Sequence, residues 1–161
     1  MSISAVRVGQ GFDIHRFSDD PSRALILGGV HFVGERGLEG HSDADVIAHA
    51  CADALLGAAG LGDIGQHFAD TDPAWKGVDS LIILDQVSVM VRSQGWLIGN
   101  IDCSVVCEQP KLAPRRDEMQ DKLSKTAGTT VSVKGRRAEG LGALGRQEGI
   151  ACWAVAVLFQ V

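Results

Sequence analysis

The stretch that decides the fold is IACWAVAVLFQV, residues 150–161, at the carboxyl-terminal end of the sequence. From Ala154 to Phe159 every residue is apolar, so a strand formed here carries apolar side chains on both of its faces. Because both faces of such a strand need cover, we expect helices to pack on one side of the sheet and neighbouring subunits to cover the other.

The remaining elements are predicted from the spacing of apolar residues and from turn residues. Six strands are expected, at residues 5–15, 25–27, 30–33, 97–107, 129–133 and 150–161. Three helices are expected, at residues 42–59, 80–93 and 114–125. Ser42 is the predicted N-cap of the first helix, and Gly28 and Gly29 are expected to turn a hairpin. The predicted fold class is α+β: one domain over residues 1–161, with a single mixed or antiparallel sheet and helices on one face.

Composition narrows the possible functions. The chain has 161 residues, 45% of them hydrophobic, and a formal net charge of -5, which argues against a nucleic-acid partner. No apolar run approaches the ~18 residues of a membrane span, and the segment from Met1 to Gln10 lacks an export signal. We therefore expect a cytoplasmic protein without a membrane partner. Four cysteines in apolar segments are expected to be reduced core residues: Cys51, Cys103, Cys107 and Cys152.

Two short segments contain candidate zinc ligands. In an extended strand Asp13 and His15 point to the same side, and we expect Ile14 between them to point into the core. His49 lies in the first predicted helix, with His41 just upstream in the loop that enters it. One aspartate and two histidines leave a fourth tetrahedral position open, which is typical of catalytic rather than structural zinc.

The residues around these ligands have two interpretations. Asp45 and Asp53 lie four residues on either side of His49, so either carboxylate could accept the spare N–H of a ligating ring. Alternatively, Asp13 and His15 are ordinary polar residues at a strand end, and Ser42 with Asp45 forms only a capping box.

A polar loop over residues 63–73 follows the first predicted helix. Its aspartates and glycines make it a candidate binding loop, because binding residues concentrate on loops held by a rigid scaffold. A calcium loop is the other interpretation, but the order of its acidic residues is not that of an EF-hand.

Taken together, these residues resemble the 2-C-methyl-D-erythritol 2,4-cyclodiphosphate synthase family. The matching segments run in the family's order along almost the whole chain: GFDIH at 11–15, HSDAD at 41–45 with His49, DALLGAA at 53–59, LGDIG at 61–65, Phe68 with DTDP at 70–73, Pro110-Lys111, and EGIA at 148–151.

The resemblance implies a homotrimer, with sheets packed around a three-fold axis and active sites between neighbouring subunits. It implies 4-diphosphocytidyl-2-C-methyl-D-erythritol 2-phosphate as the nucleotide substrate. The 2-phosphate would attack the β-phosphorus, closing the cyclic diphosphate and releasing CMP, in non-mevalonate isoprenoid biosynthesis.

The resemblance also assigns roles to individual residues. Zn²⁺ would be held by Asp13, His15 and His49 and take a β-phosphate oxygen in its fourth position. A second divalent cation, Mg²⁺ or Mn²⁺, would bridge the α- and β-phosphates with Glu139 as its protein ligand. His41 and Ser42 would donate hydrogen bonds to phosphate.

Two further segments would bind the rest of the substrate. The family places the erythritol unit against Asp63, Ile64, Gly65, Phe68, Asp70, Thr71 and Asp72. It places the cytosine and diphosphate against Cys107, Pro110, Lys111, Leu112 and Ala113. A strand-to-helix turn with a solvated lysine is the other interpretation of Pro110-Lys111.

The sequence departs from the family at two places. Arg136, Arg137 and Ala138 stand where a run of threonines is usual, so either Arg137 reaches the diphosphate with charge-assisted bonds or the segment is a solvated turn. Ala143 stands where an aromatic is common, near Arg146, which in relatives can bind an isoprenoid diphosphate on the three-fold axis.

The sequence is therefore consistent with three functions. The first is the cyclising synthase, a phosphorus–oxygen lyase in which His41 and Arg137 contact the reacting phosphates. The second is a zinc phosphoesterase that releases orthophosphate. The third is a non-catalytic trimeric metal or nucleotide binder, in which the change at Arg136-Arg137-Ala138 has disabled the chemistry.

Overall fold

The doubly apolar carboxyl-terminal segment forms an inner strand of the main sheet. The computed structural model describes residues 3–160, so Val161, the last residue of the predicted strand, lies outside the described residues. The four strands are β1 (Ala5–Arg16), β4 (Leu97–Val106), β5 (Thr130–Arg136) and β6 (Gly149–Gln160), in the spatial order β1-β6-β4-β5. Strand β6 is antiparallel to both neighbours, whereas β4 and β5 are parallel, so the sheet is mixed.

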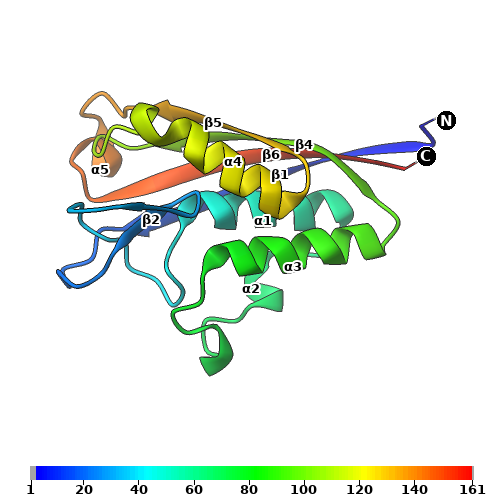
Figure 1. Ribbon diagram of the computed structural model, residues 1–161, viewed down its shortest axis with the longest axis horizontal. Coiled ribbons are helices and arrows are strands. Elements are labelled where there is room, and N and C mark those ends of the chain that lie inside the picture. Colours follow the sequence, from blue (N-terminus) through cyan, green and yellow to red (C-terminus); the bar gives the residue numbers. More distant parts are fainter. Residues whose placement is uncertain (1–2, 161) are drawn as a thin grey trace.

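Three long helices cover one face of this sheet (Figure 1). They are α1 (Val46–Ala59), α3 (Ser80–Ser93) and α4 (Arg116–Ala127). Helix α1 packs on β1 and β6, α3 packs on α1, and α4 lies along the edge strand β5. The predicted α+β class with helices on one face is confirmed, and α3 has the predicted bounds.

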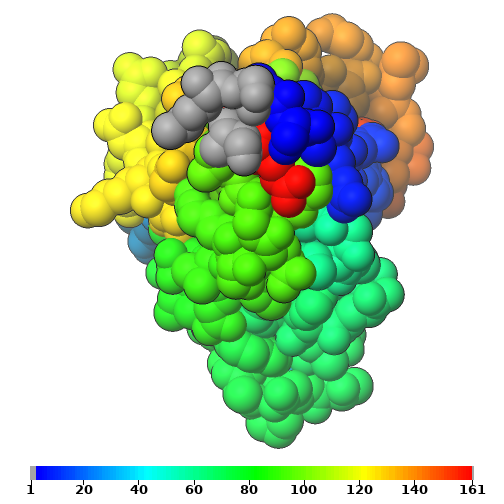
Figure 2. Space-filling view, turned by 90° about the vertical axis from the view of Figure 1, so that its right-hand side faces the viewer, coloured from blue at the N-terminus to red at the C-terminus, as the bar shows by residue number. Residues whose placement is uncertain are grey.

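Smaller elements fill the connections. They are the hairpin β2 (Leu25–Leu27) and β3 (Val30–Phe32), the short helices α2 (Ile64–His67) and α5 (Gly142–Gly145), and the 3-10 turns η1 (Pro73–Trp75) and η2 (Ala113–Arg115). The hairpin turned by Gly28-Gly29 is confirmed, but it forms its own two-stranded sheet, so the prediction of a single sheet is wrong. The segment with α2 and η1 projects from the body at the bottom of Figures 1 and 2.

Two glycines of β1 allow α1 to lie unusually close to the sheet. A Cβ built on Gly11 would lie 2.0 Å from the carbonyl oxygen of Ala50, and one on Gly9 would lie 2.2 Å from that of Ala54. Both positions therefore exclude any larger residue while the helix stays in place. This close approach brings His49 of α1 over the carboxyl-terminal end of β1, where Asp13 and His15 lie.

The start of α1 differs from the prediction. The helix begins at Val46 and its N-cap is Asp45, whose carboxylate accepts hydrogen bonds from the backbone N–H groups of Ile47 and Ala48. Ser42 is therefore not the N-cap. Between them Ala44 has a left-handed backbone, φ 59°, which turns the chain out of helical geometry.

The opposite face of the sheet carries exposed apolar side chains. They come from β1 and β6: Val6, Val8, Phe12, Ile14, Trp153 and Val155. Ile14 is 50% exposed, so the expectation that it points into the core is wrong. The helix α1 packs directly against Gly9 and Gly11, so the side of β1 that faces α1 carries the odd-numbered residues. Ile14 and the other even-numbered residues lie on the opposite side.

The two ends of the described chain lie together. Ala5 at the start of β1 pairs with Gln160 at the end of β6, and Figure 2 shows these segments, blue and red, side by side.

All four cysteines are free and buried, as expected. None of the helices in the described part of the chain is long and apolar enough to cross a membrane.

Candidate metal centre

Asp13, His15 and His49 meet where the end of β1 passes over α1. One ligand atom from each lies within 4.8 Å of the others, the one such group found among residues 3–160. Asp13 Oδ2 is 3.0 Å from His15 Nε2 and 3.0 Å from His49 Nδ1, and the two ring nitrogens are 3.4 Å apart. Bonds of about 2.1 Å to a tetrahedral Zn²⁺ place ligand atoms roughly 3.4 Å apart, so these residues fit such an ion with small adjustments.

Hydrogen bonds outside the cluster orient both rings. The backbone carbonyl of Glu39 lies 2.6 Å from Nδ1 of His15, so a neutral His15 carries its hydrogen on Nδ1 and leaves the lone pair of Nε2 for a metal. On His49, Nε2 lies 2.8 Å from Ser80 Oγ and 3.1 Å from Ser42 Oγ, and its Nδ1 faces Asp13.

The charges in the cluster are strongly coupled. Burial alone would raise the pKa of Asp13, but hydrogen bonds from His15 and His49 outweigh burial and hold that pKa well below its ordinary value. Burial would lower the pKa of His15, but the Asp13 carboxylate outweighs it and raises that pKa above its ordinary value of 6.5. A carboxylate that stays ionised beside two imidazoles is a donor set suited to a divalent cation.

Neither aspartate predicted to support His49 does so. Asp45 is fully buried and accepts four backbone N–H groups, two from α1 and two from Gly28 and Gly29 of the hairpin. Burial and the nearby Asp43 carboxylate raise the pKa of Asp45 to about 6. Asp53 accepts the N–H of Ile64. The sequence spacing of Asp45, His49 and Asp53 predicts one shared helix face, but Asp45 is the N-cap and lies before the first turn of α1.

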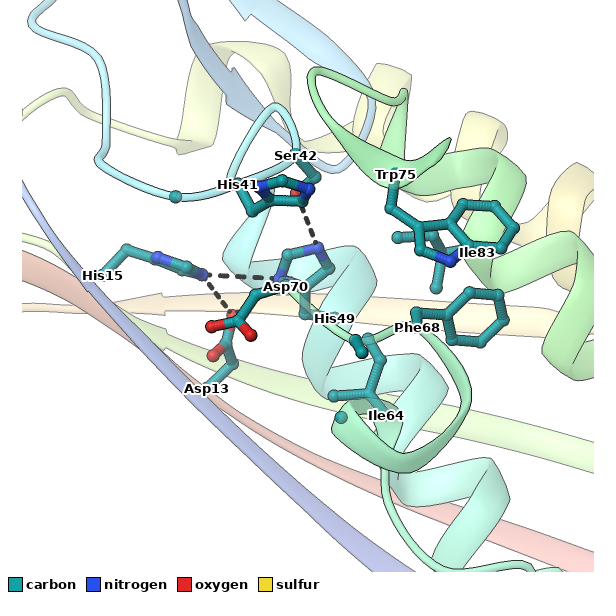
Figure 3. Close-up of a pocket in the computed structure, with 13 residues that line it drawn as sticks. Asp13, His15, His41, Ser42, His49, Ile64, Phe68, Asp70, Trp75 and Ile83 are labelled. Carbon is teal, nitrogen blue, oxygen red and sulfur yellow. Dashed lines mark hydrogen bonds and ion pairs between the residues drawn. The ribbon is translucent and has the colours of Figure 1, made fainter. Parts of the chain in front are cut away.

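A cavity of about 400 Å³ opens beside the cluster (Figure 3). Besides the candidate ligands Asp13, His15 and His49, six other residues predicted from the sequence line it: His41, Ser42, Ile64, Gly65, Phe68 and Asp70. Its volume is within the usual range of small-molecule sites. Trp75 and Ile83 also line it, and Phe68 packs edge-on against Trp75 with ring centroids 5.0 Å apart. Neither residue was predicted from the sequence, because neither belongs to a polar motif.

The other predicted residues of the loop have structural contacts. Asp63 caps α2 by accepting the N–H of Gln66, and Asp72 caps η1 by accepting that of Ala74. The Asp72 carbonyl also lies 3.0 Å from Nε2 of His41. Asp63, Thr71 and Asp72 do not line the cavity in the described structure.

A second, separate cavity of about 240 Å³ holds the predicted nucleotide segment. The predicted residues that line it are Cys107, Pro110, Lys111, Leu112, Ala113, Arg136 and Arg137. Burial raises the pKa of the Cys107 thiol to about 12, so it stays neutral. Among the described residues, none lines both cavities.

The remaining predicted residues lie outside both cavities. Ala138 donates its N–H to Glu108, and Glu139 is exposed with a left-handed backbone, φ 54°. Arg146 pairs with Glu148 at 2.7 Å, beside a third cavity that Arg16 and Arg36 also line. A single chain therefore does not bring Glu139 to the Asp13–His15–His49 cluster.

Comparison with known proteins gives consistent matches. Residues 6–159 match the model of the YgbB family. The chain is 54% identical over 157 residues to a 2-C-methyl-D-erythritol 2,4-cyclodiphosphate synthase from Nostoc sp., covering 96% of this chain and 94% of the relative. It is 51% identical to a bifunctional enzyme IspD/IspF from Anaeromyxobacter dehalogenans, of whose length it covers 40%.

Solved structures agree with the sequence matches. The bifunctional IspDF from Campylobacter jejuni superimposes with a TM-score of 0.93 at 39% identity, covering 99% of this chain and 43% of that one. The IspF from Plasmodium falciparum, solved as a CDP complex, superimposes with a TM-score of 0.84 at 32% identity, covering 99% of both chains.

Proposed function

The chain belongs to the YgbB family and is an enzyme of the 2-C-methyl-D-erythritol 2,4-cyclodiphosphate synthase type, and we propose how its residues carry out the ring closure. The substrate is 4-diphosphocytidyl-2-C-methyl-D-erythritol 2-phosphate. An oxygen of the 2-phosphate forms a bond to the β-phosphorus, and the bond from that phosphorus to the bridging oxygen breaks. CMP leaves with the bridging oxygen, and the product is the 2,4-cyclodiphosphate of isoprenoid precursor biosynthesis.

The observation that carries this proposal is the group formed by Asp13, His15 and His49, which lines the cavity of about 400 Å³. These three residues would hold Zn²⁺ and leave one position open towards the cavity. A bound divalent ion supplies Lewis acidity to a phosphate oxygen and neutralises charge that develops there.

The protein's main contribution is to hold the two reacting groups of one molecule together. Phosphoryl transfer needs alignment of the attacking and leaving oxygens more than covalent help from side chains. Alignment of this kind can supply as much as about 7 to 11 kcal/mol of the barrier reduction. We assign the erythritol unit to the wall formed by Ile64, Gly65 and Phe68, which lies directly beside the cluster.

We further propose that the active site is completed by a second copy of the chain. The cavity beside the cluster and the cavity with Lys111 and Arg137 are separate in one chain, yet the substrate has to reach both. In a homotrimer packed through the open sheet face, the second cavity of one subunit would face the first cavity of its neighbour. Arg137 would then contact the diphosphate, and Glu139 would hold the second cation, Mg²⁺ or Mn²⁺.

Two finer assignments follow from the same arrangement. Three guanidinium groups line the cavity with Arg16, Arg36 and Arg146, although each is also paired with a carboxylate. We assign to this cavity the isoprenoid diphosphate expected on the three-fold axis, whose charge would compete with those carboxylates. The reaction uses a nucleotide made inside the cell, so we place the enzyme in the cytoplasm.

The test is incubation of the pure protein with substrate, Zn²⁺ and Mg²⁺, followed by phosphorus NMR. The synthase yields the cyclic diphosphate and CMP in equal amounts. Orthophosphate as the product would show a zinc phosphoesterase instead. Unchanged substrate, bound but not turned over, would show the non-catalytic binder that the Arg136-Arg137-Ala138 departure raises.

A further inference from the structure

A chain of partly buried hydrogen bonds extends from His49 away from the cluster, towards the start of α3. Ser80 is the first residue of that helix and is fully buried, and its Oγ lies 2.8 Å from His49 Nε2. On its other side Ser80 Oγ donates a short hydrogen bond to a carboxylate oxygen of Asp43. Neither residue is one of the three candidate ligands.

The direction of these bonds is fixed by Asp43. An ionised carboxylate only accepts hydrogen bonds, and this one also accepts the backbone N–H groups of Ser80 and Asp45, each at 3.1 Å. The single hydroxyl hydrogen of Ser80 is therefore directed to Asp43. Towards His49, Ser80 Oγ offers only lone pairs, so it has to accept a hydrogen from Nε2.

That direction decides which nitrogen of His49 is free for a metal. With its hydrogen on Nε2, the ring presents the lone pair of Nδ1, and Nδ1 is the nitrogen that lies 3.0 Å from Asp13 and 3.4 Å from His15 Nε2. Figure 3 shows this edge of the ring turned towards Asp13 and His15. A ring hydrogen on Nδ1 would instead block the position that the ion needs.

We propose that Ser80 and Asp43 are positioning residues, which hold His49 in the orientation and tautomer that bind the metal through Nδ1. The inference rests on the proposed metal centre and adds to it two residues that belong to no ligand motif. Partners of this kind commonly change metal affinity by about 10- to 100-fold when they are removed.

Ser42 cannot replace Ser80 in this role. Its Oγ lies 3.1 Å from His49 Nε2 and already accepts the N–H of Ala44. Its own hydroxyl hydrogen is not taken by a carboxylate but can go to Ser80 Oγ, which lies 3.3 Å away. Without Ser80 that hydrogen is free to point at Nε2, which favours the tautomer with the hydrogen on Nδ1.

The test measures zinc affinity by competition with a chromophoric chelator, in the purified full chain. Ser80→Ala is expected to weaken zinc binding about 10- to 100-fold. Ser80→Thr, which keeps the hydroxyl, is expected to stay close to wild type. The matched control is Ser88→Ala, because Ser88 is also fully buried on α3 but donates to the Leu84 carbonyl, away from His49.

A second readout follows the hydrogen itself. In the zinc-loaded wild type, proton–nitrogen NMR should show a slowly exchanging hydrogen on His49 Nε2, and Ser80→Ala should lose this protection while Ser88→Ala retains it. Asp43→Asn should weaken zinc binding as well, because its amide can donate to Ser80 and turn the serine hydroxyl towards His49.

The outcomes separate this inference from the proposed function. Zinc binding by Ser80→Ala that equals that of Ser88→Ala overturns the positioning role while leaving the metal centre intact. A wild-type protein that binds no zinc overturns both. Loss of protection without loss of affinity would also overturn the role, because the hydrogen bond would then not support the ligand.

Discussion

At the scale of single residues, Asp13 is the centre of the proposed site. One of its oxygens lies 3.0 Å from a nitrogen of each histidine, so in the metal-free chain it is the common partner of both rings. A metal ion would take over that role by binding all three groups at once. Metal and protons therefore compete for the same atoms, and this competition can be measured.

The metal-free and zinc-loaded proteins should differ in the pH dependence of their stability. The pKa of Asp13 is lower in the folded protein than its ordinary value of 3.8. Ionised Asp13 therefore stabilises the fold above pH 3.8, and this stabilisation is lost as the pH falls through the lowered pKa. The pKa of His15 is higher in the folded protein than its ordinary value of 6.5. Protonated His15 therefore stabilises the fold fully below pH 6.5, and this stabilisation is lost as the pH rises through the raised pKa. Zinc binds only when His15 is neutral, so zinc affinity increases as the pH rises through the same range.

Thermal unfolding of both forms across this pH range checks the prediction. The stripped protein should lose stability as the pH rises above 6.5, and the difference in Tm between the loaded and stripped forms should grow. Asp45, whose pKa is raised to about 6, also makes stability depend on pH, but equally in the two forms. Its effect therefore cancels in the Tm difference between them. A difference that shrinks as the pH rises would contradict the shared Asp13–His15 site.

Arg137 is the residue whose role the sequence left open. It is exposed and lines the second cavity, and in the proposed assembly it would reach a diphosphate bound in the neighbouring subunit's site. Arg137→Thr should raise the KM for the substrate about tenfold or more, because a charge-assisted contact is typically worth about 1.5 to 3 kcal/mol. Lys125→Thr, on the exposed end of α4, is the control for losing one positive charge. Faster turnover with unchanged KM would mean that Arg137 does not compensate for the missing threonine.

The sequence predicted the three candidate ligands that the structure brings together, because their spacing carries the information. Asp13 and His15 share a face of a strand, and His49 lies in a recognisable helix. Ser80 and Trp75 could not be found in this way, since nothing in the sequence shows that the start of α3 and the η1 turn lie beside residues 13–15. That proximity is a property of the fold.

At the scale of elements, the close packing of α1 on β1 sets the geometry of the site. Gly11→Ala places a Cβ within 2.0 Å of the Ala50 carbonyl oxygen, so α1 has to move away from the sheet. The variant should lose about 1 to 3 kcal/mol of unfolding free energy or more, and should also bind zinc more weakly because His49 moves with the helix.

The control for this substitution is Gly57→Ala on the same helix. A Cβ at Gly57 would lie 3.7 Å from the Gln10 carbonyl oxygen, an ordinary contact, so the change should raise stability by up to about 1 kcal/mol through helix propensity. Chemical denaturation and chelator competition measure both effects. A Gly11→Ala variant as stable as the wild type would mean that the glycines do not set the spacing.

Element boundaries were predicted well where the local chemistry is unambiguous. Helix α3 matches at both ends because Asp79 caps its start and Gly95, with φ 82°, follows its end. The start of α1 was missed because Ser42 and Asp45 are both good N-caps by type, and contact with the β2–β3 turn selects Asp45. The short α2 and η1 are too brief to show any periodicity.

At the scale of the whole molecule, the apolar face of β1 and β6 is the main unexplained surface of a single chain. Val8 is 66% exposed there, on the same face of the sheet as Phe12 and Trp153. Contiguous exposed apolar area usually marks an interaction surface. The doubly apolar segment 154–159 predicted that this face needs cover, but sequence alone does not give the geometry of a partner.

Val8→Asp tests the proposed trimer. A carboxylate on this face would be buried and unpaired in the assembly, so the variant should shift from trimer to monomer in sedimentation velocity and lose ring closure, while keeping zinc binding. Val33→Asp is the control, because Val33 is 80% exposed but lies just beyond β3, away from this face. A Val8→Asp protein that sediments like the wild type would contradict assembly through this surface.

We expect ring closure to require a metal held by Asp13, His15 and His49. The rate of CMP release by enzyme stripped of metal with a strong chelator and then titrated with Zn²⁺ in the presence of Mg²⁺ measures this requirement. We predict no release from the stripped enzyme, full recovery at one Zn²⁺ per chain, and no recovery in His49→Ala. Undiminished CMP release from the stripped enzyme would contradict the account.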